Sequence, residues 1–178
     1  RLPGRKQEAL DMLERFLQRQ PMAIEARYAY ARLLLADGRS DEARAQLERT
    51  LAQQPGSPAV LFSLAQLAYQ GKQPEDAKRY LQRYLDLPRS VPRDNAPALL
   101  FIAQIDEEAG RLDAAIESLS KVPRGEEFAS ATIRRALLMG RQGKVEAARE
   151  VPEAVAHAAE AGDKVGAVPA QKVGDGAD

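Results

Sequence analysis

The 178-residue chain contains no cysteine and no tryptophan, and aromatic residues make up only 5% of it. The absence of cysteine excludes disulfides, thiolate metal sites and cysteine nucleophiles. The 26 basic and 26 acidic residues balance, which argues against a nucleic-acid binder, because proteins that neutralise phosphates usually carry a basic excess. No run of 18 or more apolar residues occurs, so the sequence offers no candidate for a membrane span.

Residues for catalysis are equally scarce. His157 is the only histidine, so a zinc site would need three carboxylates, and no Ser/His/Asp pattern surrounds it. The glycines follow no nucleotide-binding motif. We therefore expect no enzyme activity, no metal site and no cofactor, and we interpret His157 as a surface residue of a helix.

What the sequence does contain is an internal repeat. GRKQEALDMLERFLQRQP at residues 4–21 and GRSDEARAQLERTLAQQP at residues 38–55 match at ten of eighteen positions, 34 residues apart. The alanine of this pattern recurs as Ala9, Ala43, Ala77, Ala115 and Ala148. A period of this length predicts stacked copies of one small structural unit.

Each unit reads as two helices joined by a glycine-containing turn. Apolar residues in front of each turn recur with helical spacing, as in Tyr30, Ala31 and Leu34. We expect left-handed glycines to end the first helices at Gly38, Gly71, Gly110 and Gly143. Small residues let paired helices approach closely, so we expect Ala31, Ala65, Ala103 and Ala136 to face Ala43, Ala77, Ala115 and Ala148.

A 34-residue helix–turn–helix with small residues at positions 8 and 20, an apolar residue at 24 and proline at 32 resembles the tetratricopeptide repeat. The resemblance covers roughly residues 1–150 and implies an all-α solenoid, a right-handed superhelix of antiparallel helix pairs. It divides the chain into 1–21 (second helix of a truncated repeat), 24–57 (repeat), 58–95 (repeat with an extended loop), 96–128 (repeat with a shortened second helix), 129–161 (degenerate repeat) and 162–178 (flexible tail). Because residues 1–21 match only a second helix, we expect the sequence to be a piece of a longer array.

The pattern departs from regularity at three places. The segment 87–97 adds four residues, and it is either a longer loop that leaves stacking intact or a local change that shapes a binding site. Pro123 shortens a second helix, which predicts a kink or gap near residues 122–128. The tail 162–178 is too poor in apolar residues to order itself, unless a groove or a neighbouring molecule holds it.

In tetratricopeptide proteins the first helices line a concave groove, and the resemblance places five positions of each repeat there. Three of the nine aromatic residues, Tyr28, Phe62 and Tyr69, fall on this face, where they either bind a partner or pack between helices. Glutamines beside them could hydrogen-bond a peptide backbone. The candidate binding residues are Tyr28, Arg32, Leu35, Phe62, Gln66, Tyr69, Gln70, Leu100, Gln104 and Glu107.

Two clusters of charged residues lie in the expected helices. Asp106, Glu107 and Glu108 diverge around a helix, so we expect a solvated face, or alternatively an acidic lip of the groove. Arg134, Arg135 and Arg141 form a mild basic cluster without interleaved aromatics. Neither cluster indicates nucleic-acid binding.

The favoured function is a non-catalytic scaffold that binds a peptide or partner protein in the groove. The alternative is a self-associating assembly module, because Leu10, Leu13 and Leu17 of the leading helix lack a preceding helix to cover them. The style of the repeats is similar to that of multi-repeat proteins of Gram-negative bacteria, some of which are periplasmic or outer-membrane adaptors. The sequence is compatible with the cytoplasm and with the periplasm, and that analogy favours the periplasm.

Overall fold

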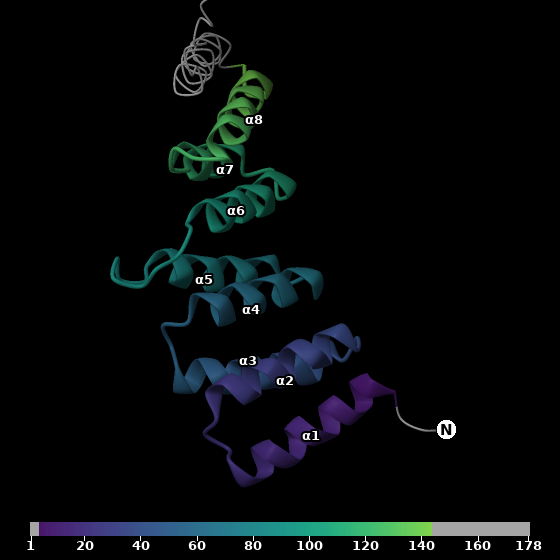
Figure 1. Cartoon of the computed structure of the whole chain (residues 1–178). Coiled ribbons are helices and arrows are strands. Elements are labelled where there is room, and N and C mark those ends of the chain that lie inside the picture. The colour runs from purple at the N-terminus through teal and green to yellow at the C-terminus, as the bar shows by residue number, and fades with distance from the viewer. Residues whose placement is uncertain (1–3, 144–178) are drawn as a thin grey trace, which may run out of the picture. The chain divides into compact units, whose positions relative to one another are not determined.

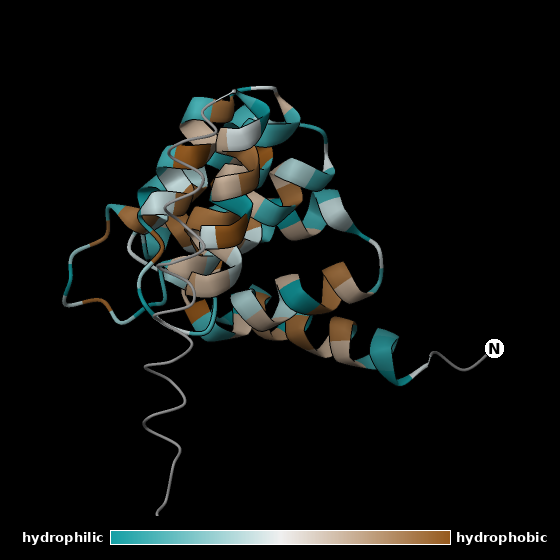
Figure 2. Ribbon diagram, turned by 90° about the horizontal axis from the view of Figure 1, so that it is seen from above, coloured by the Kyte–Doolittle hydropathy of each residue, from teal (hydrophilic) through white to brown (hydrophobic). Residues whose placement is uncertain are grey.

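The computed structural model describes residues 4–143, and every regular element in this range is an α-helix. The helices are α1 (Arg5–Arg19), α2 (Ile24–Ala36), α3 (Ser40–Gln53), α4 (Pro58–Gln70), α5 (Pro74–Leu85), α6 (Ala96–Glu108), α7 (Leu112–Ser120) and α8 (Phe128–Arg141). Figure 1 shows these helices in chain order, and Figure 2 shows apolar and polar residues alternating along them, as amphipathic helices require. The all-α class expected from the sequence is confirmed.

The chain divides into two compact units, Arg1–Ile105 and Asp106–Asp178, and the boundary falls in the last turn of α6. The first unit is built of helix pairs: α2 packs most closely against α3, and α4 against α5. Contacts of α1 with α2 and of α3 with α4 join the pairs. The first unit is therefore a stack of antiparallel hairpins, and its buried apolar residues form two clusters, one around α1 and α2 and one that extends from α2 to α6.

Four alanines of the repeat pattern are completely buried in the helix pairs of the first unit. Ala31, Ala43, Ala65 and Ala77 have no exposed surface, as the packing argument required. Large apolar side chains fill the space around them, among them Leu47, Leu61, Leu64 and Leu81, each at most 1% exposed. Ala136, in contrast, is only half-buried, and Ala148 lies outside the described residues.

Local signals explain where helices begin. Ser57 caps α4, because its Oγ accepts a hydrogen bond from the Val60 amide at 3.4 Å. Pro58 and Pro74 stand at the first positions of α4 and α5, where a missing N–H costs nothing. α4 and α6 start at Pro58 and Ala96, which are also the expected first residues of two repeats. The division into repeats remains a prediction.

The left-handed residue of each turn corrects one expectation. Gly38, Gly110 and Gly143 have positive φ, but Gly71 does not, and Lys72 takes the left-handed conformation instead, with φ 57°. The hydrogen bonds agree: the Arg39 amide donates to the Leu34 oxygen at 2.9 Å, and the Gln73 amide donates to the Ala68 oxygen at 2.8 Å. The expectation that Gly71 is the left-handed residue of this turn was wrong, because the hydrogen bonds that close the turn place Lys72 in register with Gly38.

Leucines of α1 correct a second expectation. Leu10 and Leu17 are 2% and 8% exposed, because they pack with Tyr30 and Leu34 of α2 and Ala43 of α3. Leu13 is half-buried against the same cluster. The apolar side chains that α1 does expose lie elsewhere on the helix, at Met12 and Phe16.

In the second unit, α7 ends at Ser120 and packs against α8. Val122, 3% exposed, anchors the connection that contains Pro123. The second helix expected for the degenerate repeat, His157 and the tail 162–178 all lie outside the described residues. Within residues 4–143, no helix is long and apolar enough to cross a membrane, and no group of three metal-binding side chains converges.

Candidate partner-binding site

The long loop between α5 and α6, which projects from the helices in Figure 1, is held by one arginine. The Arg93 guanidinium donates four hydrogen bonds of 2.7–3.1 Å to backbone oxygens of the chain that leads into the loop. The acceptors are the carbonyl oxygens of Leu85, Leu87, Pro88 and Val91. A planar five-donor group suits this task, since it can serve several carbonyls from one position.

Tyr84 of α5 fixes the far end of the same loop. Its hydroxyl donates to the Asp94 carbonyl oxygen at 2.7 Å, and the Arg93 guanidinium lies 6.0 Å from its ring centroid. Burial raises the pKa of Tyr84 above its ordinary value, Asp94 raises it further, and Arg93 opposes the change. The Asp94 carboxylate in turn accepts a hydrogen bond from the Ala96 amide at 2.9 Å, at the start of α6. The loop is thus tied to both flanking helices.

Between this loop and α4 lies an apolar pocket of about 360 Å³. Phe62 and Tyr84 provide its aromatic walls. The remaining lining residues are Pro58, Ala59, Pro92, Arg93, Asp94 and Pro97. Its volume is at the lower end of the range for pockets that accept a ligand or a large side chain. Because aromatic rings and prolines make up most of the lining, the pocket suits an apolar side chain.

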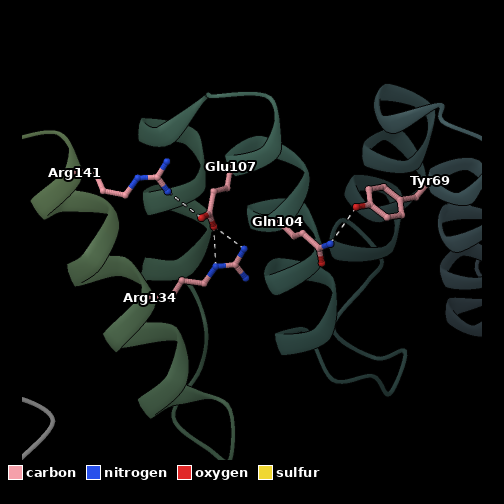
Figure 3. Close-up of polar contacts among 5 residues, drawn as sticks. All are labelled: Tyr69, Gln104, Glu107, Arg134 and Arg141. Carbon is pink, nitrogen blue, oxygen red and sulfur yellow. Dashed lines mark hydrogen bonds and ion pairs between the residues drawn. The ribbon is translucent and has the colours of Figure 1, made fainter.

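An aromatic chain continues from the pocket along the first helices. Phe62 lies 5.9 Å from Tyr84 and 6.1 Å from Phe101, and Phe101 makes an edge contact with Tyr69 at 5.1 Å between ring centroids. Gln104 of α6 donates from Nε2 to the Tyr69 hydroxyl at 3.1 Å (Figure 3). Such tilted and edge-on pairs are favourable. Phe62, Tyr69 and Phe101 are half-buried, whereas Tyr84 is buried.

The structure places the predicted binding residues of the first unit on α2, α4 and α6. Tyr28, Leu35, Phe62 and Tyr69 are half-buried and pack against a common core, which leaves only part of each side chain accessible. Arg32, Gln66 and Gln70 are exposed, whereas Leu100 and Gln104 are half-buried. Phe62 and Tyr69 are brought together through Phe101, and Gln104 joins them through its hydrogen bond to Tyr69. Their binding role remains a prediction.

Glu107, in the second unit, is engaged differently. Its carboxylate accepts two hydrogen bonds from Arg134, at 2.7 and 2.9 Å, and one from Arg141 at 3.2 Å (Figure 3). Asp106 is 1% exposed and pairs with Arg111 at 2.6 Å. The expected solvated acidic face is therefore wrong for Asp106 and Glu107. Arg111, just beyond the turn that follows α6, pairs with Asp106, and two arginines of α8 pair with Glu107.

Sequence reasoning missed Tyr84, Phe101 and Arg93. Phe101 follows directly after Leu100, a predicted groove position, so its proximity was accessible from the sequence. Tyr84 lies three residues after the buried Leu81 on the second helix of its pair, whereas the predicted groove positions were all on first helices. Nothing in the sequence distinguishes Arg93 from the neighbouring Arg89.

The sequence matches the family model of the tetratricopeptide repeat twice, over residues 3–60 and 34–90. Among curated proteins, no sequence match was found. Solved structures show the same fold. MamA superimposes with a TM-score of 0.69 at 18% identity, covering 87% of this chain and 89% of MamA.

Two further solved structures support the same conclusion. YrrB, described as a tetratricopeptide protein with an unusual peptide-binding site, gives a TM-score of 0.65 at 20% identity, over 84% of this chain and 76% of YrrB. PilF of Pseudomonas aeruginosa gives 0.61 at 16% identity, over 85% and 75%. These likenesses show the fold, an all-α solenoid. The repeated sequence, the helix pairs and these matches together show that the chain is a tetratricopeptide repeat protein.

Proposed function

We propose that this scaffold binds an extended peptide, or an extended segment of a partner protein, along α2, α4 and the first part of α6. One observation carries the proposal: the apolar pocket of about 360 Å³ adjoins Phe62, a residue that the repeat pattern independently assigns to the binding face. An apolar anchor side chain of the partner would enter this pocket. Central, well-packed anchors of that kind contribute most of the binding energy in many interfaces.

The surroundings of the pocket suit a peptide. Gln66 and Gln70 lie exposed on α4, where amide groups can pair with a peptide backbone. Arg32 is exposed on α2 and can hold one acidic side chain. The loop 86–95, tied by Arg93, gives the pocket a rigid wall, which reduces the entropy lost on binding.

A peptide library selected on the immobilised protein tests the proposal, with affinities of the selected peptides measured by fluorescence polarisation. Ala59→Gln places a longer side chain at an exposed position of the pocket wall and should weaken binding at least tenfold without lowering the melting temperature. The matched control is Ala52→Gln, the same change at an exposed position of α3 that does not line the pocket. Equal affinities of both variants would refute the pocket as the anchor site.

Self-association is the second candidate. The observation that favours it is a pair of exposed apolar residues one turn apart on α1: Met12 is 65% and Phe16 42% exposed. Met22, 71% exposed, follows in the next loop. A second copy of the chain would cover this surface, since repeat units bury their apolar faces by stacking.

A further inference from the structure

The apolar pocket is one end of a strip of aromatic rings, and the rings of α4 in this strip have a regular spacing. Phe62 and Tyr69 are seven residues apart, nearly two helical turns, so both lie on one face of α4. The rise along the helix axis between them is about 10.5 Å. Phe101 of α6 lies against both, with ring centroids 6.1 Å from Phe62 and 5.1 Å from Tyr69. We call the Phe62–Tyr84 end the first aromatic site and the Tyr69–Phe101 end the second aromatic site.

Amide side chains accompany these rings on α4. Gln66 lies four residues after Phe62, Gln70 directly follows Tyr69, and both glutamines are exposed. Neither side chain makes a hydrogen bond within residues 4–143, so their N–H groups are available as donors. The best ligand for this face therefore offers apolar groups to the rings and hydrogen-bond acceptors to the amides.

The charges of this face favour an uncharged ligand. α4 contains no charged residue. At the first aromatic site the two charged lining residues, Arg93 and Asp94, are of opposite sign. A charged side chain of a ligand would lose water along α4 without gaining an ion pair, which is unfavourable.

A polyproline II helix has the required properties. Its backbone makes no internal hydrogen bonds, so its carbonyl oxygens can accept from a partner. Its three residues per turn bring every third side chain onto one edge, at intervals of about 9.3 Å. That interval is close to the rise of about 10.5 Å between the two rings of α4. Grooves lined by aromatic residues are a recurring way to bind such segments.

We propose that this face selects a proline-rich segment of a partner in the polyproline II conformation. Two prolines three residues apart pack on the first and second aromatic sites, and Gln66 donates to a carbonyl oxygen between them. The inference rests on the proposed function and narrows its ligand to one class of peptide. The fixed φ of proline also reduces the conformational entropy that the segment loses on binding.

Fluorescence polarisation with three labelled nonapeptides tests the ligand class. The spaced peptide has proline at every third position and alanine elsewhere, and the clustered peptide has the same composition with its three prolines adjacent. The third peptide has leucine in place of each proline of the spaced peptide. We expect the spaced peptide to bind at least fivefold more tightly than the other two.

The leucine peptide separates this proposal from the proposed function. If it binds as tightly as the spaced peptide or more tightly, and Ala59→Gln weakens its binding, the selection of proline is overturned while the pocket remains an apolar anchor site. If none of the three peptides binds, the proline proposal is overturned, and the peptide library then decides the proposed function.

Two variants test the spacing and the donor. Tyr69→Leu keeps an apolar side chain but removes the ring of the second aromatic site, so the spaced peptide should lose its preference over the clustered one, whereas a general loss of structure would weaken both peptides equally. Gln66→Ala should weaken the spaced peptide about fivefold, and Gln18→Ala, the same change at an exposed position of α1, is the matched control. An unchanged preference in Tyr69→Leu, or equal affinities of the two glutamine variants, would overturn the proposal. If Tyr69→Leu does not fold, the glutamine pair decides.

Discussion

Replacing Arg93 by alanine should release the loop between α5 and α6. The change removes four hydrogen bonds to backbone oxygens, and three of them lie in partly buried surroundings. A carbonyl oxygen that loses such a donor and regains water only in part costs roughly 0.5–1.5 kcal/mol, which gives about 2–4 kcal/mol for three. The entropy regained by no longer ordering an arginine side chain offsets up to about 2 kcal/mol. We expect a net loss of about 2 kcal/mol in the stability of the loop.

Native-state hydrogen exchange measures this loss locally. The Val91 amide donates to the Pro88 oxygen at 2.9 Å, so its protection reports whether the loop is closed. A loss of about 2 kcal/mol corresponds to roughly thirtyfold faster exchange at this amide, with little change in α2. Arg89→Ala is the matched control, since Arg89 is exposed in the same loop.

Two outcomes would refute the reasoning. Exchange at Val91 in Arg93→Ala within a factor of two of the Arg89→Ala control would show that the four hydrogen bonds contribute nothing net. Full restoration by Arg93→Lys would show that charge alone suffices, because an ammonium lacks the planar fork that reaches several carbonyls.

Two further predictions concern the turns and the surface of α1. Lys72→Gly should raise the free energy of unfolding, measured by urea denaturation, by about 1 kcal/mol, because glycine adopts positive φ without strain. Gly38→Ala should lower that free energy by a similar amount. Changes of the opposite sign would contradict the assignment of the left-handed residues. Phe16→Glu should reduce self-association measured by sedimentation equilibrium, and a wild-type protein that stays monomeric at high concentration would remove that candidate function.

The fold was accessible from the sequence because it rests on local, repeated signals. The same spacing separates Ala31 from Ala65 and Ala43 from Ala77, so the sequence predicted that all four would be buried between paired helices. The candidate site was accessible only in part. The repeat frame placed Phe62 and Tyr69 on the first helices, but it carries no information about a residue such as Arg93, whose partners are set by the path of an irregular loop.

Charges show the same division. Asp106 and Glu107 are adjacent in a helix, so the sequence suggested solvated carboxylates, whereas Arg111 and Arg134 reach them only after the chain turns back. The turn residue Lys72 was missed for a related reason, since a glycine one position earlier gave the stronger local signal.

The repeat spacing was enough to predict the helices, their pairing and the family, because each depends on spacing along the chain and on side-chain size. The contacts between helices were needed to show which arginines pair with Asp106 and Glu107 and where the apolar pocket lies. Those features depend on the distances between groups on different helices and loops, and these distances are fixed only when the helices pack.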